Sequence, residues 1–203
     1  MRIVSKVAFI VLGSLLLASV AQADLLTTFT GSISSTDPTQ LGRISRNSVP
    51  QTWADNEPYP GFINTSTTYW YHTYAVNVGA TPFVEVTVDS IYTTTFLAAY
   101  LDSYDPTNPS ATWLGDPGTS GNFWGTNPLS FQVYVPLHHQ LILVANNTAV
   151  RGGGLNTPYT VIVQGFLDTQ YTPTPEPSSL LLLGSGALGL AGVLRRKAAS
   201  WLQ

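Results

Sequence analysis

The chain has 203 residues, enough for one domain with a hydrophobic core and two short end segments. It contains no cysteine, which excludes disulfide bonds, thiol catalysis and thiolate metal sites. Residues 24–174 hold three arginines and no lysine against ten acidic residues, and their net charge of −7 excludes the basic surface that nucleic-acid binding requires.

The first 23 residues have the three-part layout of a secretory signal peptide. Arg2 and Lys6 are positive, residues 7–20 are almost entirely apolar, and Ala21 and Ala23 supply the small side chains that signal peptidase accepts. The apolar run is shorter than the roughly 20 residues that a membrane-spanning helix needs. We therefore expect a signal-peptide helix over residues 1–23 that signal peptidase removes.

Residues 24–170 predict a single β-domain. Apolar residues alternate with polar ones over residues 84–89 and 129–135, the period-two pattern of half-buried strands. Turn residues separate these segments from the other expected strands, at 25–33, 69–78, 96–101, 141–145 and 159–166. About seven short strands with polar connections predict an all-β fold, an antiparallel β-sandwich or jelly roll. Residues 42–68 are expected to form an ordered excursion over it.

The three histidines do not form a recognisable catalytic or metal-binding pattern. His138 and His139 are adjacent, so in an extended chain their side chains point to opposite faces. His72 lies among tyrosines in a predicted strand. No nucleophile elbow, phosphate-binding loop or dinucleotide-binding glycine pattern is present in the sequence. We expect no catalytic residues and no histidine metal site.

Acidic residues in the loops allow two weaker hypotheses. Asp55 and Glu57 share one loop and Asp102 and Asp105 another, but a glycosidase needs two carboxylates that face each other across a cleft. Asp102, Asp105 and Asn108 carry the oxygen ligands that calcium prefers, without matching the EF-hand loop. The alternative for these residues is an ordinary Asx-type turn. Calcium is therefore the one candidate cofactor.

Large aromatic residues gather in predicted loops. Exposed rings can stack on the faces of sugars, which suits polysaccharide binding. The alternative is that the rings fold back and cap the ends of the sandwich. The aromatic residues concerned are Trp53, Tyr59, Phe62, Trp113, Phe123 and Trp124. Among them, Trp53, Trp113 and Trp124 are the candidates for sugar contacts.

The C-terminal segments differ from the body in composition. Residues 171–179 are rich in proline, which forbids a helix or a central strand there. Residues 180–203 begin with 15 uncharged, mostly apolar residues, long enough for a helix of roughly 22 Å, short for a hydrocarbon core of about 30 Å. A basic cluster that we expect to stay cytoplasmic follows: Arg195, Arg196 and Lys197. This pattern predicts a short membrane helix that anchors the chain before processing.

The tripeptide Pro175-Glu176-Pro177, followed by this helix and basic cluster, resembles the PEP-CTERM sorting signal. The resemblance implies recognition by exosortase, a membrane-embedded transpeptidase-like enzyme of Gram-negative bacteria that make exopolysaccharide. It implies secretion across the inner membrane, transient anchoring there, and then residence at the outer surface or in the extracellular matrix.

The body also resembles the bacterial pre-peptidase C-terminal type of β-sandwich. The similarity rests on Thr28-Phe29-Thr30-Gly31, on residues 37–40 and on the predicted strand at 159–161. It implies a jelly-roll accessory domain without catalytic residues. Together, these features predict an exported, non-enzymatic envelope or matrix protein linked to exopolysaccharide or biofilm. A carbohydrate-binding module is the alternative, and a secreted hydrolase the weaker one.

Overall fold

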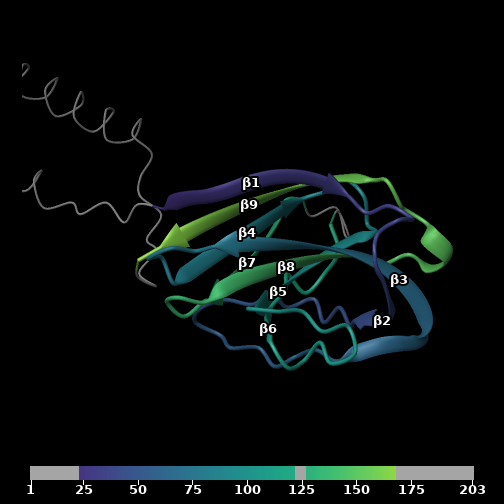
Figure 1. The fold of residues 1–203 in the computed structure, drawn as a ribbon, viewed down its shortest axis with the longest axis horizontal. Coiled ribbons are helices and arrows are strands. Elements are labelled where there is room, and N and C mark those ends of the chain that lie inside the picture. The colour runs from purple at the N-terminus through teal and green to yellow at the C-terminus, as the bar shows by residue number, and fades with distance from the viewer. Residues whose placement is uncertain (1–22, 122–126, 168–203) are drawn as a thin grey trace, which may run out of the picture. The chain divides into compact units, whose positions relative to one another are not determined.

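The computed structural model describes residues 23–121 and 127–167, which form nine β-strands in two layers (Figure 1). The expected signal-peptide helix, membrane helix and sorting motif lie outside the described residues. The strands are β1 (Asp24–Ser32), β2 (Thr39–Ile44), β3 (Phe62–Asn77), β4 (Phe83–Asp89), β5 (Thr95–Leu101), β6 (Trp113–Gly115), β7 (Leu129–Tyr134), β8 (Gln140–Asn147) and β9 (Pro158–Phe166). A single turn of 3-10 helix, η2 (Val150–Gly152), precedes β9.

The strands pair antiparallel in two sheets, with the orders β1-β9-β4-β7 and β2-β3-β8-β5-β6. Apart from β2, each sheet has four strands, with β1 beside β9 in one sheet and β3 beside β8 in the other. This is the strand order of a jelly roll. The predicted all-β antiparallel sandwich is confirmed.

The core between the sheets follows the alternation seen in the sequence. Val84, Val86 and Val88 of β4 are fully buried, whereas Glu85 and Thr87 between them are partly exposed. The same period appears in β7 and β9. Because successive side chains of a strand point to opposite faces, one apolar face per strand suffices to fill the layer between the sheets.

A second hydrophobic cluster covers the outer face of the five-stranded sheet. It contains Phe96, Ala98 and Tyr100 of β5, together with Ile142 and Val144 of β8. The rings packed against it come mostly from neighbouring loops and strand ends: Tyr59, Phe62, Tyr71, Tyr104 and Trp113. Because β5 and β8 are covered on both faces, their sequences are continuously apolar instead of alternating.

The excursion predicted for residues 42–68 is shorter in the structure. Residues 45–61 form the connecting loop, because β2 extends to Ile44 and β3 begins at Phe62. The Gln51 N–H donates to the Asp116 carbonyl, just after β6, at 3.0 Å, and the Gln51 carbonyl accepts from the Gln132 N–H of β7 at 2.9 Å. Since β6 and β7 are edge strands, this loop covers one open edge of each sheet.

Candidate functional site

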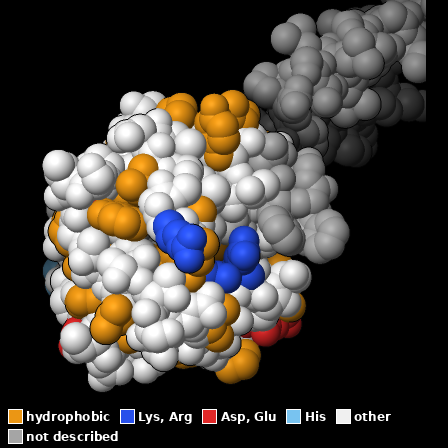
Figure 2. All heavy atoms as spheres, turned by 90° about the vertical axis from the view of Figure 1, so that its right-hand side faces the viewer, with side chains coloured by type: hydrophobic (Ala, Val, Ile, Leu, Met, Phe, Trp, Pro, Cys, Tyr) orange, Lys and Arg blue, Asp and Glu red, His pale blue; other side chains and the backbone are white. Residues whose placement is uncertain are grey.

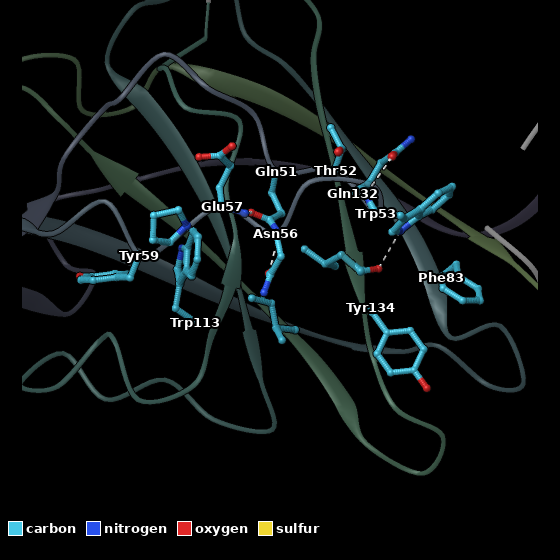
Figure 3. A pocket seen from close by; sticks show the side chains of 13 residues that line it. Gln51, Thr52, Trp53, Asn56, Glu57, Tyr59, Phe83, Trp113, Gln132 and Tyr134 are labelled. Atoms are coloured by element: carbon cyan, nitrogen blue, oxygen red, sulfur yellow. Dashed lines mark hydrogen bonds between the residues drawn. The ribbon is translucent and has the colours of Figure 1, made fainter. Parts of the chain in front are cut away.

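A cleft of about 650 Å³ opens where the loop of residues 45–61 crosses the edge strands β6 and β7 (Figure 3). Aromatic side chains and polar side chains line it in similar number. Its lining consists of Gln51, Thr52, Trp53, Asn56, Glu57, Pro58, Tyr59, Phe83, Trp113, Leu114, Gln132, Val133 and Tyr134. Binding clefts of this size commonly combine aromatic walls with a few fixed polar groups.

Trp53 anchors one aromatic wall of the cleft. Its indole N–H donates to the Val133 carbonyl at 3.1 Å. Its ring stands edge-on to Phe83 and to Phe166, at centroid distances of 5.8 and 5.3 Å. Phe83 in turn lies 5.3 Å from the ring of Tyr134, which is 52 % exposed. We call Trp53, Phe83 and Tyr134 the first wall; its outermost ring is open to solvent.

Tyr59 and Trp113 form the second wall, with ring centroids 5.6 Å apart and nearly perpendicular planes. Asp116 is buried close to them, and desolvation raises its pKa to about 6. A hydrogen bond from the Gly118 N–H to the Asp116 Oδ1, at 2.7 Å, partly offsets that rise. Burial, and to a lesser degree the Asp116 charge, raises the pKa of Tyr59 to about 12. The second wall is therefore neutral, and its tyrosine stays protonated.

Amide side chains fix the polar part of the cleft. The Gln51 Nε2 donates to the Asn56 Oδ1 at 3.2 Å, and the Gln51 Oε1 accepts from the Glu57 N–H at 3.1 Å. The Gln132 Nε2 donates to the Glu85 carboxylate at 2.9 Å. These bonds hold the loop and the side chains of the cleft in one arrangement. Such a preorganised mixture of rings and amides is suited to binding a ligand.

The structure brings together two of the three tryptophans predicted to contact sugars. Trp53 and Trp113 line the same cleft, although 60 residues separate them in the sequence. Trp124 and Phe123 lie outside the described residues. The expectation that all these aromatic residues lie in loops is wrong for Trp113, which is in β6, and for Phe62, which begins β3. A three-residue strand is too short to show a period, so β6 leaves no signal in the sequence.

The acidic residues considered for hydrolysis or calcium are separately engaged. Glu57 lines the cleft but Asp55 does not. Asp105 accepts hydrogen bonds from the Thr107 N–H and hydroxyl, at 2.8 and 2.7 Å, which is the Asx-type turn considered as the alternative. Asp102 binds His139 and the Gln140 N–H. Within residues 23–121 and 127–167, no three His, Cys, Asp or Glu side chains are grouped to hold a metal ion.

The three histidines lie at two separate places, each with its own polar neighbours. The His72 Nδ1 lies 2.9 Å from the Asp37 carboxylate, which is also bonded to Ser34. Desolvation tends to raise the pKa of Asp37, but hydrogen bonds from the Ser34 N–H and from His72 outweigh it and lower that pKa. His138 and His139 line a separate polar hollow together with Asp102. These contacts link neighbouring loops and strands.

Sequence reasoning singled out Glu57 but missed the amide side chains of the cleft and two of its rings. Gln51, Asn56 and Gln132 look like ordinary loop and strand residues in the sequence. Of the two missed rings, Phe83 and Tyr134, only Tyr134 could have been recognised from the sequence. It is a large ring in the outward-facing register of its strand. A ring in that position is a candidate for an exposed platform.

Among the residues that the structure describes, no helix is long and apolar enough to span a membrane.

Comparisons with known proteins identify the C-terminal segment. Residues 173–197 match the PEP-CTERM protein-sorting motif. Among solved structures, the body is similar to the C-terminal CBM6 of LamC, a marine laminarinase from Zobellia galactanivorans. The TM-score is 0.29 at 12% identity, and the match covers 68% of this chain and 98% of that one. No curated protein matches the sequence significantly. The chain therefore carries a PEP-CTERM protein-sorting motif at residues 173–197, after its β-sandwich body, and this motif indicates export and exosortase-dependent sorting to the cell surface of a Gram-negative bacterium.

Proposed function

We propose that the chain is a non-enzymatic protein of the outer surface or extracellular matrix, associated with exopolysaccharide. The sorting motif at residues 173–197, which follows the β-sandwich, carries this proposal. In this scheme signal peptidase removes residues 1–23, and the C-terminal helix holds the chain in the inner membrane until exosortase acts. The sandwich then reaches the matrix as a folded unit.

The test compares wild-type cells with cells that lack exosortase. The protein is expected outside the inner membrane, without the segment after Pro177, only when exosortase is present. A variant with Pro175, Glu176 and Pro177 replaced by alanine serves as the matched control and should remain membrane-bound in both strains. An intact C-terminal peptide on the surface protein of wild-type cells would contradict the scheme.

A second candidate function, carbohydrate binding by the sandwich, is favoured by one specific observation. Trp53 and Trp113 converge on a single cleft that also presents Gln51, Asn56 and Glu57. Aromatic faces attract the C–H groups of a sugar ring, while amides and carboxylates bond to its hydroxyls. The two candidates are compatible, because a binding module can hold a sorted protein in a polysaccharide matrix.

The non-enzymatic part of the proposal has its own assay. The mature protein, incubated with the host exopolysaccharide, is expected to bind without releasing new reducing ends. Release of reducing ends that is lost in the Glu57→Gln variant would instead support the hydrolase alternative.

A further inference from the structure

We propose that the cleft takes an uncharged stretch of polysaccharide several sugar units long, and that it discriminates against acidic polysaccharides. This inference rests on the second candidate function, carbohydrate binding, and adds the class of carbohydrate. Three features of the cleft carry it: the separation of its two walls, the chemistry between them, and the distribution of charge.

The two aromatic walls flank a polar centre. Figure 3 shows Trp53, Phe83 and Tyr134 on one side and Tyr59 and Trp113 on the other. Each wall is held by its own ring contacts, between Trp53 and Phe83, Phe83 and Tyr134, and Tyr59 and Trp113. A single sugar ring can stack on one wall only. An oligosaccharide can use both, so the arrangement favours a chain over a monosaccharide.

Between the walls, the cleft offers groups that suit hydroxyls. Gln51 and Asn56 lie there in Figure 3, and Glu57 lies on the side of the second wall. Because the Asn56 Oδ1 already accepts from Gln51, its Nδ2 group is oriented to donate to a ligand. Sugar hydroxyls can donate to a carboxylate such as that of Glu57 and accept from an amide such as that of Asn56. An aliphatic or purely aromatic ligand would leave these groups without partners, at a cost in free energy.

The charge of the cleft disfavours acidic polysaccharides. Glu57 is the only charged side chain among the described residues that line the cleft. The nearby Glu85 and the buried Asp116 are also acidic. A uronate chain placed there would approach carboxylates without a cation to pair with it.

None of the three arginines of the body lines the cleft. Figure 2 shows cationic side chains on the end of the sandwich that bears η2, and Arg151 belongs to η2 itself. The cleft contacts Phe166 at the opposite end of β9, whose nine residues span roughly 26 Å. That distance exceeds the Debye length of about 8 Å at physiological ionic strength, so Arg151 does not offset the charge of Glu57.

The experiment uses the mature protein from the host and four probes. Two are the neutral and acidic fractions of the host exopolysaccharide, separated by anion exchange; the others are alginate and a synthetic proline-rich peptide. We expect binding to the neutral fraction, stronger for its long fragments than for its monosaccharides, and no binding to alginate. Binding is measured by affinity electrophoresis and titration calorimetry at 0.15 M salt.

Matched variants locate the binding. Tyr134→Ala should weaken neutral binding about tenfold without lowering the melting temperature, because the ring is half exposed. Tyr92→Ala, a tyrosine of similar exposure in the loop after β4, should have no effect. Glu57→Lys should admit alginate to the cleft, because the substitution reverses the charge of the lining.

The outcomes separate this inference from the function on which it rests. If alginate or the acidic fraction binds the wild-type cleft and Tyr134→Ala abolishes that binding, the cleft binds carbohydrate but the neutral class is wrong. If neither polysaccharide fraction binds, carbohydrate binding itself is refuted. If only the proline-rich peptide binds, the cleft is a protein-docking site. If neutral binding is equally strong in Tyr134→Ala, the polysaccharide uses another surface.

Discussion

Gly118 attaches the loop of residues 45–61 to the sandwich through a close backbone approach. Its φ angle is +72°, and a Cβ atom at this position would lie 2.4 Å from the backbone nitrogen of Val49. Its carbonyl accepts a hydrogen bond from the Ser48 N–H at 2.9 Å. A side chain here would therefore face both an unfavourable φ and a steric clash with main-chain atoms that cannot rotate away.

Replacing Gly118 by alanine is expected to lower the free energy of unfolding by more than about 2 kcal/mol. The matched control is Gly79→Ala, where φ is also positive, at +60°, but no atom lies within 4 Å of the added Cβ. The control should cost only about 1 kcal/mol, from the backbone angle alone. Urea unfolding followed by tryptophan fluorescence measures both. Equal losses in the two variants would show that the Val49 contact is unimportant.

Asp116 makes stability depend on pH in an unusual direction. Burial raises its folded-state pKa to about 6, above the value of 3.8 expected in the unfolded chain. Between these values the folded state binds more protons than the unfolded state, so the free energy of unfolding contributed by this group falls as the pH rises. A pKa raised by about two units corresponds to a total change of about 3 kcal/mol in the contribution of Asp116 to the free energy of unfolding.

The comparison of wild type with Asp116→Asn isolates this effect. Asparagine does not titrate, so the difference in unfolding free energy, wild type minus variant, should decrease by about 2 kcal/mol between pH 4 and pH 7. Chemical denaturation at four pH values in this window measures the difference. A difference that does not change with pH would mean that Asp116 is not desolvated as described.

Whole strands differ in how well their sequences predicted them. β4, β7, β8 and β9 lie within one or two residues of the expected segments, because their side chains alternate or form a continuous apolar run. β2 and the first half of β3 were missed. Many of their residues are Thr, Asn, Ser and Gly, as in Thr39-Gln40-Leu41-Gly42, and residues 63–66 of β3 are all exposed. These strands form through pairing with each other, which periodicity does not reveal.

The candidate site was predictable only in part, for a related reason. Its tryptophans stand out in the sequence by residue type, and two of them, Trp53 and Trp113, line the same cleft. The cleft itself depends on one loop joining the edges of two sheets, through hydrogen bonds between residues up to 81 positions apart, as from Gln132 to Gln51. Such pairing follows from the jelly-roll topology, and spacing along the chain does not encode it.

Hydrogen exchange should distinguish the strands by their place in the sheets. The amides of β8 lie between two strands and under two hydrophobic clusters, so they should exchange at the rate of global unfolding. The amides of β6, an edge strand of three residues, should exchange orders of magnitude faster. Mass spectrometry of peptic fragments measures both. Similar protection of β6 and β8 would contradict the sheet order.

At the scale of the whole chain, both ends of the described body lie side by side. Asp24 begins β1 and pairs with Gly165, and Phe166 ends β9. Cleavage after Ala23 would therefore leave β1 complete, with its first residue in the sheet. Intact-mass analysis of the surface protein should find Asp24 at the N-terminus and a C-terminus close to residue 177. A mature chain that still starts at Met1 would refute cleavage by signal peptidase.

The contact between Trp53 and Phe166 has a mechanical consequence. Consider a polysaccharide chain bound in the cleft and an attachment of the protein beyond residue 167. Tension between them would act on two neighbouring points of the domain, the cleft and the end of β9. The force would pass through the first wall and the end of β9, and the rest of the two sheets would not bear it. A domain connected in this way can bear tension repeatedly without unfolding. Under excess force it would release the bound polysaccharide before it unfolds.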